Sequence, residues 1–409
     1  MSKASVIFAE QFYYPDGWGG TQIPRDITIH LAQSGFEVCV VCGSDQYASL
    51  GGDPGPDPQT RGVRVLRLPR LFGGNIRSWK LLRQMWFYIL AGPVLLTCGR
   101  PSVIVAQTNP PLLVPIAALV ARLRRVPFVV IAQDIYPEVM FAHGMAKPDG
   151  MSGRLLACLF AWAYSRAAKV VALGEIAAQR LLRKGVQTDC IEVVSNWATG
   201  DESIERGHLN ELRKEWNLEN RFVILYSGNM GNAHDFDTPI AALRLVLKHS
   251  RDVTLVFIGE GSRLEDAKRA ASDAGVLHAV QFRPLVPATR LPQSLGLAHV
   301  ALVTLREGFE GLVVPSKLLG YMARGIPTIY VGPYSDVEQI LVESGGGLCF
   351  RNGDAEALSC GIQSLIAGRD RLDVMGAAAA RYYQSHLSRS KGLQKYAGLL
   401  NAVVQNSTR

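Results

Sequence analysis

Short runs of apolar and β-branched residues alternate with helix-like segments along almost the whole chain. Near-continuous apolar strands that are separated by helices are typical of parallel sheets covered on both faces. A polar, charged interval at residues 199–220 interrupts the alternation once, and 409 residues are enough for two domains. Strands are expected at residues 5–9, 38–42, 63–68, 103–106, 128–132, 169–173, 191–194, 222–227, 254–258, 280–283, 300–304, 328–331 and 348–350.

The pattern predicts an α/β chain with two Rossmann-like, doubly wound domains that face a central cleft. The N-terminal domain is placed at residues 1–198 and the C-terminal domain at 199–390. Such sheets bind ligands beyond the carboxyl ends of their strands, so we expect the site where those ends meet the cleft.

The net charge of +8 favours an acidic partner, such as a phosphorylated ligand or an anionic membrane surface. The sequence has no basic run, zinc-finger spacing or aromatic–basic pattern, which argues against nucleic acid. No signal-peptide pattern opens the chain, and no apolar run reaches the roughly 18 residues of a spanning helix. Seven cysteines, mostly in apolar segments, fit a reducing cytoplasm.

Residues 309–329 combine an acid–glycine pair, a Pro-Ser-Lys step and an amphipathic helix. Free N–H groups at a helix start suit a phosphate, and Ser316 and Lys317 stand at that start. Glu310, just upstream, is placed to hold hydroxyl groups. A hydroxyl-binding acid beside a phosphate nest is what a nucleotide-sugar site needs, although an ordinary helix–strand connection has the same residue types.

A glycine-containing loop follows the first strand of each domain. The first includes Gly19 and Gly20, and the second runs from Ser227 to His234. Their glycines permit close backbone approach to a ligand. The first loop lacks the spacing of a dinucleotide fingerprint, which argues against a dehydrogenase. His234 is expected to donate to a phosphate if protonated, or simply to form a hydrogen bond. The alternative is a surface histidine near a helix start.

Asp134 follows a strongly apolar strand, where a carboxylate is a candidate for chemistry or acceptor binding. The alternative is that Asp134 caps the following turn.

A separate signal covers residues 70–100, where arginines and lysines flank the stretch WKLLRQMWFYILAGPVLL. Basic residues beside an aromatic–aliphatic face predict contact with an anionic membrane. Arg122, Arg124 and Arg125 are expected to extend this surface. The alternative is a helix packed on the core with solvated basic residues.

The motifs PDGWGG, QDIYP, SNW, YSGNMG and EGLVVPSKLLGYMARGIP, in this order, resemble glycosyltransferase family 4 of the two-domain GT-B architecture. The resemblance covers nearly the whole chain and is closest to transferases of bacterial polysaccharide assembly, including fucosamine-type enzymes. It implies retaining, metal-independent transfer from a nucleotide sugar, with no cofactor. It also implies a C-terminal helix, within residues 391–409, that returns to the first domain.

The resemblance implies that Glu310 touches the hydroxyls of the donor sugar. Gly311 and Leu312 would offer amides to the sugar or the diphosphate. An arginine and a lysine of the family fall on Asn229 and His234, which removes formal positive charge. Lys317 is expected to supply part of that charge. The donor-binding residues are predicted to be Gly19, Gly20, Ser227, Gly228, Asn229, Gly231, His234, Arg283, Gly311, Leu312, Ser316 and Glu338.

The chain departs from the family at three further points. The second glutamate of the family, which holds the ribose, falls on Gly320, and Glu338 is the expected substitute. The histidine of the family before Asp134 is Gln133. Asp235 and Asp237 spell the DxD pattern of metal-dependent transferases, but Asp237 is interpreted as a helix N-cap, and no metal is expected.

The predicted function is transfer of a sugar, plausibly of the N-acetylhexosamine type, from a UDP-sugar to a lipid-linked or polysaccharide-precursor acceptor. Asp134, Glu310 and Lys317 are the predicted catalytic residues. The expected place is the cytoplasmic face of the inner membrane, as a peripheral protein. Two alternatives stay open: a nucleotide-sugar epimerase of similar build, and a catalytically silent scaffold in polysaccharide assembly.

Overall fold

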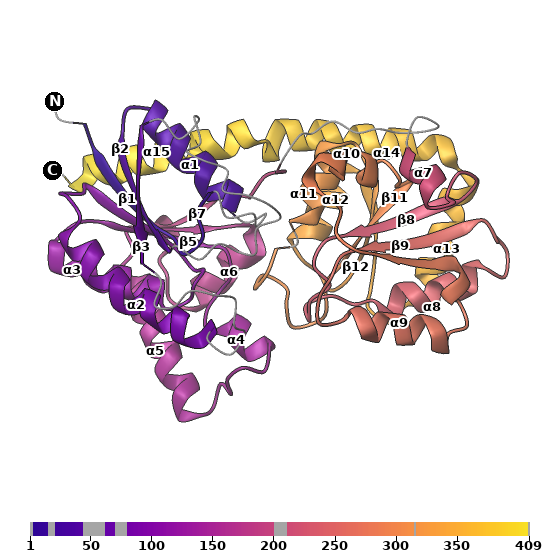
Figure 1. Cartoon of the computed structure of the whole chain (residues 1–409), viewed down its shortest axis with the longest axis horizontal. Helices are drawn as coiled ribbons and strands as arrows, with labels where there is room; N and C mark the ends of the chain where they lie inside the picture. The colour runs from indigo at the N-terminus through magenta and orange to yellow at the C-terminus, as the bar shows by residue number, and fades with distance from the viewer. Residues whose placement is uncertain are drawn as a thin grey trace. The chain divides into compact units, whose positions relative to one another are not determined.

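The structure is a computed structural model that describes residues 3–14, 21–43, 62–69, 80–199, 211–314 and 316–407. It divides into two compact units (Figure 1). Unit 1 comprises Met1–Ser195 with Ser390–Arg409, and unit 2 comprises Asn196–Arg389. These limits lie within three residues of the predicted boundaries at 198 and 390.

Unit 1 contains a parallel sheet in the order β3-β2-β1-β4-β5-β6-β7. The chain builds outward from β1 to β3 and then returns to place β4 beside β1, so the strand order reverses between β1 and β4. The strands are β1 (Ser5–Ala9), β2 (Glu37–Gly43), β3 (Val63–Leu68), β4 (Val103–Gln107), β5 (Phe128–Ala132), β6 (Lys169–Ala172) and β7 (Ile191–Val193).

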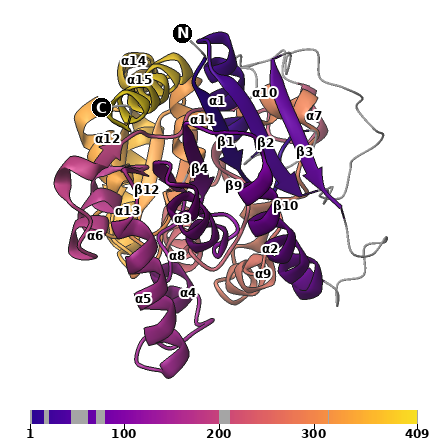
Figure 2. The same cartoon turned by 90° about the vertical axis from the view of Figure 1, so that its left-hand side faces the viewer.

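Helices cover both faces of this sheet, as the apolar strands require. On one side α2, α3 and α5 lie next to one another (Figures 1 and 2). The helices of unit 1 are α1 (Gln22–Gln33), α2 (Lys80–Thr97), α3 (Leu113–Arg124), α4 (Glu138–Ala142), α5 (Met151–Ser165), α6 (Glu175–Arg183) and α15 (Arg389–Ser407).

The C-terminal helix α15 groups with unit 1 although its sequence follows unit 2. Its buried residues recur at helical spacing, which gives it one apolar face. Lys395 Nζ also donates to the Val193 carbonyl at 3.2 Å. The buried side chains of this face are Leu393, Tyr396, Leu399, Leu400 and Val403.

Unit 2 contains a second parallel sheet in the order β10-β9-β8-β11-β12-β13, so its order reverses between β8 and β11. Figure 1 shows α8, α9 and α13 on one side of this sheet and α11, α12 and α14 on the other. The strands are β8 (Phe222–Ser227), β9 (Val253–Ile258), β10 (Val280–Arg283), β11 (Val300–Thr304), β12 (Thr328–Val331) and β13 (Gly347–Phe350). The helices are α7 (Glu211–Glu215), α8 (Asp237–Val246), α9 (Leu264–Asp273), α10 (Leu291–Leu295), α11 (Lys317–Ala323), α12 (Asp336–Ser344), α13 (Ala355–Ala367) and α14 (Arg369–Tyr382).

All thirteen predicted strands are present, each within one residue of its expected limits. The core of unit 2 includes an aromatic cluster near the carboxyl ends of β8 and β9. Phe236 packs edge-on against Tyr226 and Phe257, with ring centroids 5.1 and 5.4 Å apart. Such pairs add stabilisation beyond the area that they bury. The cluster anchors the loop that follows β8.

The helix cap predicted at Asp237 is wrong. Asp235 Oδ1 accepts the N–H groups of Asp237 and Thr238, at 3.0 and 3.3 Å. Asp235 Oδ2 accepts from Thr238 Oγ1 at 2.6 Å and from Asn352 Nδ2 at 2.9 Å. Asp237 instead pairs with Arg263. Asp235 thus satisfies the free amides at the start of α8 and ties that helix to the segment after β13.

Candidate functional site

The loop that follows β8 meets the start of α11 in unit 2. Lys317, the first residue of α11, places Nζ 3.2 Å from His234 Nε2. The same ammonium lies 5.0 Å from the ring centroid of Tyr226. The backbone of Gly228 passes so close that a Cβ there would lie 2.6 Å from Lys317 Cε. We call these four residues the Lys317 cluster.

The loops after β8 and β9 are joined through their backbones. Gly228 N–H donates to the Ile258 carbonyl, and Met230 N–H donates to the Glu260 carbonyl, both at 2.8 Å. Gly228 has φ +133°, in the region that favours glycine. The backbones of Gly228 and Gly259 lie so close together that a Cβ on Gly259 would lie 2.0 Å from the Gly228 oxygen. These contacts fix the loop against which Lys317 packs.

His234 is buried and neutral, and it positions Lys317. Its Nδ1 lies 2.8 Å from the Thr304 carbonyl, which can only accept, so Nδ1 carries the proton. Nε2 is then free to accept from Lys317 Nζ. Burial, and to a smaller extent the charge of Lys317, lowers the pKa of His234 to about 3. His234 is therefore neither a cationic donor nor a surface histidine, and the expectation of a simple hydrogen-bonding role agrees with these contacts.

Burial lowers the pKa of Lys317 to about 8. The neighbours of its ammonium are a neutral imidazole and an aromatic face. No carboxylate of the residues that the structure describes forms an ion pair with it. A buried charge without a counter-ion is costly, and an anionic ligand would remove that cost. The Lys317 cluster is therefore a candidate anion site.

The turn between β11 and α11 is tied to this cluster. Arg306 N–H donates to the carbonyl of Ala233, which directly precedes the cluster histidine, at 2.8 Å. Within the turn, Glu310 Oε2 accepts the Gly308 N–H at 2.8 Å. Gly308 and Gly311 have φ of +88° and +67°. The fold thus sets Glu310 in a glycine-dependent turn that is bonded to the loop after β8.

The two amides predicted to face the donor differ in their bonding. No acceptor for the Gly311 N–H lies among the residues that the structure describes. The Leu312 N–H already donates to the Phe309 carbonyl at 3.1 Å, so the expectation for Leu312 is wrong. Ser316 is exposed and makes no side-chain cap on α11. Since α11 has only seven residues, the positive charge here comes mainly from Lys317.

Other predicted residues lie beside the cluster, and two tyrosines missed by the sequence interpretation hold them. Ser227 N–H donates to the hydroxyl of Tyr321, at 2.9 Å. Tyr226 Oη–H donates to the carbonyl of Asn229, at 2.6 Å. The Asn229 side chain is exposed, and a Cβ on Gly231 would lie 3.1 Å from its Nδ2. Both tyrosines stand inside the quoted motifs, which was the only available signal.

The structure does not join two predicted donor-binding residues to the cluster. Arg283 lies on the edge strand β10, where its guanidinium stacks on Trp216 at 5.0 Å and bonds to Gln281. Glu338 forms a two-pronged ion pair with Arg351, with one N–O distance of 2.8 Å. Each of these side chains already has a partner within unit 2.

Gly320 leaves open space on α11. A Cβ built there meets only Arg324 Nη1, at 3.7 Å. The same Nη1 donates to the Gly320 carbonyl at 3.0 Å. The helix would therefore accept a side chain at this position, so crowding within unit 2 does not explain the glycine.

In unit 1, Asp134 lies just beyond the end of β5. Its N–H donates to Thr108 Oγ1 at 3.1 Å, which joins the ends of β4 and β5. Burial raises the pKa of its carboxyl to about 6, and the charge of Asp134 in turn helps to raise the pKa of Tyr136. Among the described residues, the Asp134 carboxylate forms no hydrogen bond to the next turn, and α4 begins without a side-chain cap. Gly19 and Gly20 lie outside the described residues.

One side of unit 1 carries many exposed apolar side chains. Helix α2 buries Phe87, Ala91 and Leu95 and exposes apolar residues elsewhere, so it is not simply a core helix with a polar outer face. Arg122 and Arg125 are exposed nearby, whereas Arg124 binds the Leu95 and Cys98 carbonyls at the end of α2, contrary to expectation. Arg70 and Arg77 lie outside the described residues. The exposed apolar residues of α2, α3 and α5 are Leu81, Leu82, Met85, Ile89, Leu96, Leu119, Leu123, Met151 and Leu155.

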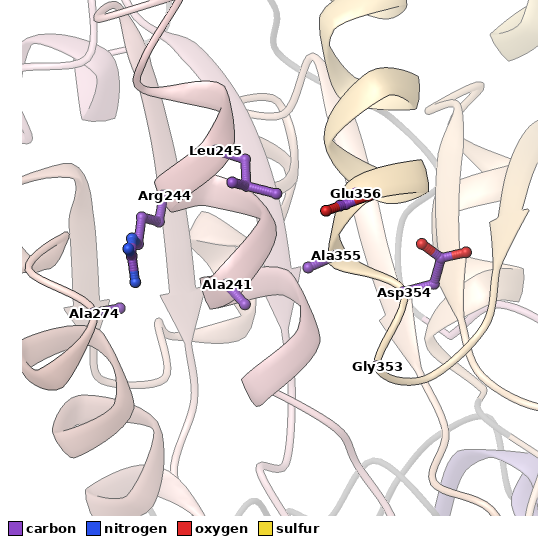
Figure 3. A pocket seen from close by; sticks show the side chains of 8 residues that line it. All are labelled: Ala241, Arg244, Leu245, Ala274, Gly353, Asp354, Ala355 and Glu356. Atoms are coloured by element: carbon purple, nitrogen blue, oxygen red, sulfur yellow. The ribbon is translucent and has the colours of Figure 1, made fainter.

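A pocket of about 520 Å³ lies between α8 and the start of α13, away from the Lys317 cluster (Figure 3). Figure 3 shows Arg244 on one side and Asp354 and Glu356 on the other. Within the described ranges, no group of three or more histidine, cysteine or acidic side chains could hold a metal ion. None of the helices in those ranges is long and apolar enough to cross a membrane.

Two family models match successive parts of the chain. The glycosyl transferase 4-like domain matches residues 19–197. The model for glycosyl transferases group 1 matches residues 210–382. Together they cover most of both units.

Named relatives and solved structures are similar to the chain over most of its length. The probable glycosyltransferase WbjE of Pseudomonas aeruginosa is 27% identical over 83% of this chain and 84% of its own. The putative colanic acid biosynthesis glycosyl transferase WcaI of Escherichia coli K12 is 28% identical over 61% of this chain and 62% of its own. The crystal structure of Anabaena HepE in complex with UDP superposes with a TM-score of 0.69 at 14% identity, over 97% of this chain and 100% of HepE.

Proposed function

The chain belongs to the family 4-type glycosyltransferases of GT-B fold, and from that premise we propose that it moves a sugar from a UDP-linked donor to a lipid-linked or polysaccharide-precursor acceptor. Polysaccharide assembly is supported by the similarity to WcaI, a putative colanic acid biosynthesis glycosyl transferase. The N-acetylhexosamine type of donor sugar is carried over from the sequence resemblance.

The observation that carries the donor assignment is the Lys317 ammonium. It is partly buried, held by a neutral histidine, and without a counter-ion among the described residues. A diphosphate supplies the missing negative charge. The open N–H of Gly311 and the carboxylate of Glu310 lie in the turn between β11 and α11 that leads to Lys317. The amide can bind phosphate or sugar oxygens, and the carboxylate can accept hydrogen bonds from sugar hydroxyls.

The proposed chemistry is retaining transfer without a metal. The acceptor hydroxyl attacks the anomeric carbon on the face that the diphosphate leaves. A new C–O bond forms, the bond to the phosphate oxygen breaks, and the hydroxyl proton passes to that oxygen. Lys317 stabilises the charge that develops on the leaving group, and this needs no strongly basic side chain. Asp134, with its pKa near 6, is assigned to orient the acceptor hydroxyl.

The proposed place of action is the cytoplasmic face of the inner membrane. Support comes from the exposed apolar residues of α2, α3 and α5, together with Arg122 and Arg125 and the net charge of +8. Apolar side chains inserted between lipids and basic ones at anionic headgroups are the chemistry of a peripheral protein.

The test is a thermal-shift screen of the full chain against UDP-, GDP- and ADP-sugars, followed by product analysis. A ligand that binds only the folded state raises the melting temperature. We expect the largest rise with a UDP-sugar, and release of UDP together with a glycosylated acceptor. A larger rise with a GDP-sugar would overturn the choice of base. Conversion to a different free nucleotide sugar would overturn transfer in favour of epimerisation.

A further inference from the structure

Two buried polar side chains, each with one unsatisfied atom, stand where the strand order of unit 1 reverses. Glu10 follows β1 directly, and Gln107 ends β4. The paired register runs through Ala9 and Ala106, so these two residues are the next neighbours across the strands. Glu10 is 3% exposed and Gln107 is 4% exposed. Ligands of doubly wound sheets bind at this reversal point.

One polar atom of each side chain lacks a hydrogen-bond partner in the described part of the chain. Glu10 Oε1 accepts the Gln11 N–H at 3.1 Å, whereas Oε2 has no partner. The Gln107 side-chain nitrogen has none either. Leaving such atoms unsatisfied is destabilising, and most buried polar groups are bonded. The two unsatisfied atoms belong to residues that are neighbours across β1 and β4, at the edge where a ligand would arrive.

The surroundings indicate the chemical class of that ligand. Burial raises the pKa of Glu10, while backbone N–H groups of Gln11 and Phe12 oppose this only partly. The pKa of Asp134, one strand further along, is likewise raised by burial, and no cation lowers either value. A carboxyl group and an amide both form hydrogen bonds with hydroxyls. At this edge of the sheet, the guanidinium of Arg67 is already bonded to the carbonyls of Gly43 and Tyr14.

We propose that Glu10 and Gln107 form a subsite for an uncharged, hydroxyl-bearing part of the acceptor, so that the acceptor presents a neutral sugar to unit 1 rather than a phosphate. This inference rests on the proposed function only in identifying the ligand as the acceptor. A hydroxyl can donate to the free Glu10 oxygen or accept from it, and it can accept from the Gln107 amide. Glu10 and Gln107 act in binding and specificity, not as bases.

The test measures binding of neutral p-nitrophenyl hexosides and of the same hexosides with a 6-phosphate, by ligand-observed NMR on the full chain without donor. Variants are Gln107→Met, Glu10→Leu and the milder Glu10→Gln. The matched control is Gln187→Met, at an exposed position of unit 1. Thermal melting of each variant and UDP binding to each are recorded in parallel.

We expect wild type to prefer the neutral hexosides. Gln107→Met and Glu10→Leu should weaken their binding at least tenfold, while Glu10→Gln and Gln187→Met stay within about threefold. The melting temperature should hold or rise, because an unsatisfied polar atom is replaced by an apolar group. Unchanged hexoside binding, or preference for the phosphorylated hexosides, would overturn the subsite and leave only a buried water site. If wild type did not bind UDP, the donor assignment would be refuted, whatever the hexoside binding shows.

Discussion

Lys317 Nζ lies 3.2 Å from His234 Nε2, and the two residues are 83 positions apart in the sequence. The histidine is held by Thr304 through its other nitrogen, so it presents a lone pair to the ammonium. This pair provides a positive charge in a partly buried place without a carboxylate ion pair among the described residues. The proposed donor site depends on this pair.

The pH dependence of UDP binding should follow Lys317. Its pKa of about 8 means that the ammonium is charged below that value and loses its proton as the pH rises through it. UDP affinity should therefore fall as the pH rises from 7 to 9.5. A terminal phosphate titrates near pH 6, so its own charge changes little over this range. Lys317→Arg keeps its charge throughout, so calorimetry on this variant should show a flat profile. An identical fall in both proteins would contradict the assignment.

Removing His234, the hydrogen-bond acceptor that holds Lys317, should weaken activity without removing the charge of the lysine. His234→Leu should lower kcat about tenfold, because the ammonium loses its fixed position and a hydrogen bond. The loss of that bond also favours the neutral amine, so the alkaline limb of the pH–rate profile should move to lower pH. His234→Gln offers an amide oxygen as a hydrogen-bond acceptor. It should therefore restore much of kcat and much of the original position of the alkaline limb. A profile that stays in place in His234→Leu would argue against a positioning role.

Gly228 should be required because of the space that it leaves. In Gly228→Ala the new Cβ would stand 2.6 Å from Lys317 Cε. UDP affinity should fall about tenfold as the lysine shifts. Gly275→Ala is the matched control, since it also has positive φ, at +70°, but meets nothing within 4 Å. Both variants carry backbone strain of order 1 kcal/mol, so both should melt at lower temperature. If both lose UDP affinity equally, strain and not the clash is the cause.

Membrane contact should depend on the exposed apolar face of α2. Met85 and Ile89 are 47% and 59% exposed. The double change of both residues to Glu should abolish sedimentation with vesicles that contain about one third phosphatidylglycerol. Val374→Glu, at a residue of unit 2 that is 67% exposed, is the control. Equal vesicle binding by the double variant and wild type would refute the surface.

The strands could be predicted because each is a local apolar run whose position depends little on the rest of the chain. The same reasoning found Lys317 and the glycine loop after β8. It could not find the contact between Lys317 and His234, because tertiary packing creates it and changes the charge of the histidine. It also assigned the cap of α8 to Asp237, although Asp235 is the residue whose side chain reaches the amides. Glu10 and Gln107 were only polar residues at strand ends until the topology placed them side by side.

The assignment of Lys317 to the diphosphate is tested by comparing UDP with uridine, by calorimetry on wild type and on Lys317→Met near pH 7. A charge-assisted hydrogen bond contributes about 1.5–3 kcal/mol, or roughly 10- to 100-fold in affinity. Lys268→Met, at a partly exposed lysine of unit 2 that pairs with Glu265, is the control. We predict that Lys317→Met loses UDP affinity by that factor, while uridine affinity and the melting temperature stay the same or rise. Equal UDP affinity in Lys317→Met and wild type would contradict the assignment of Lys317 to the diphosphate.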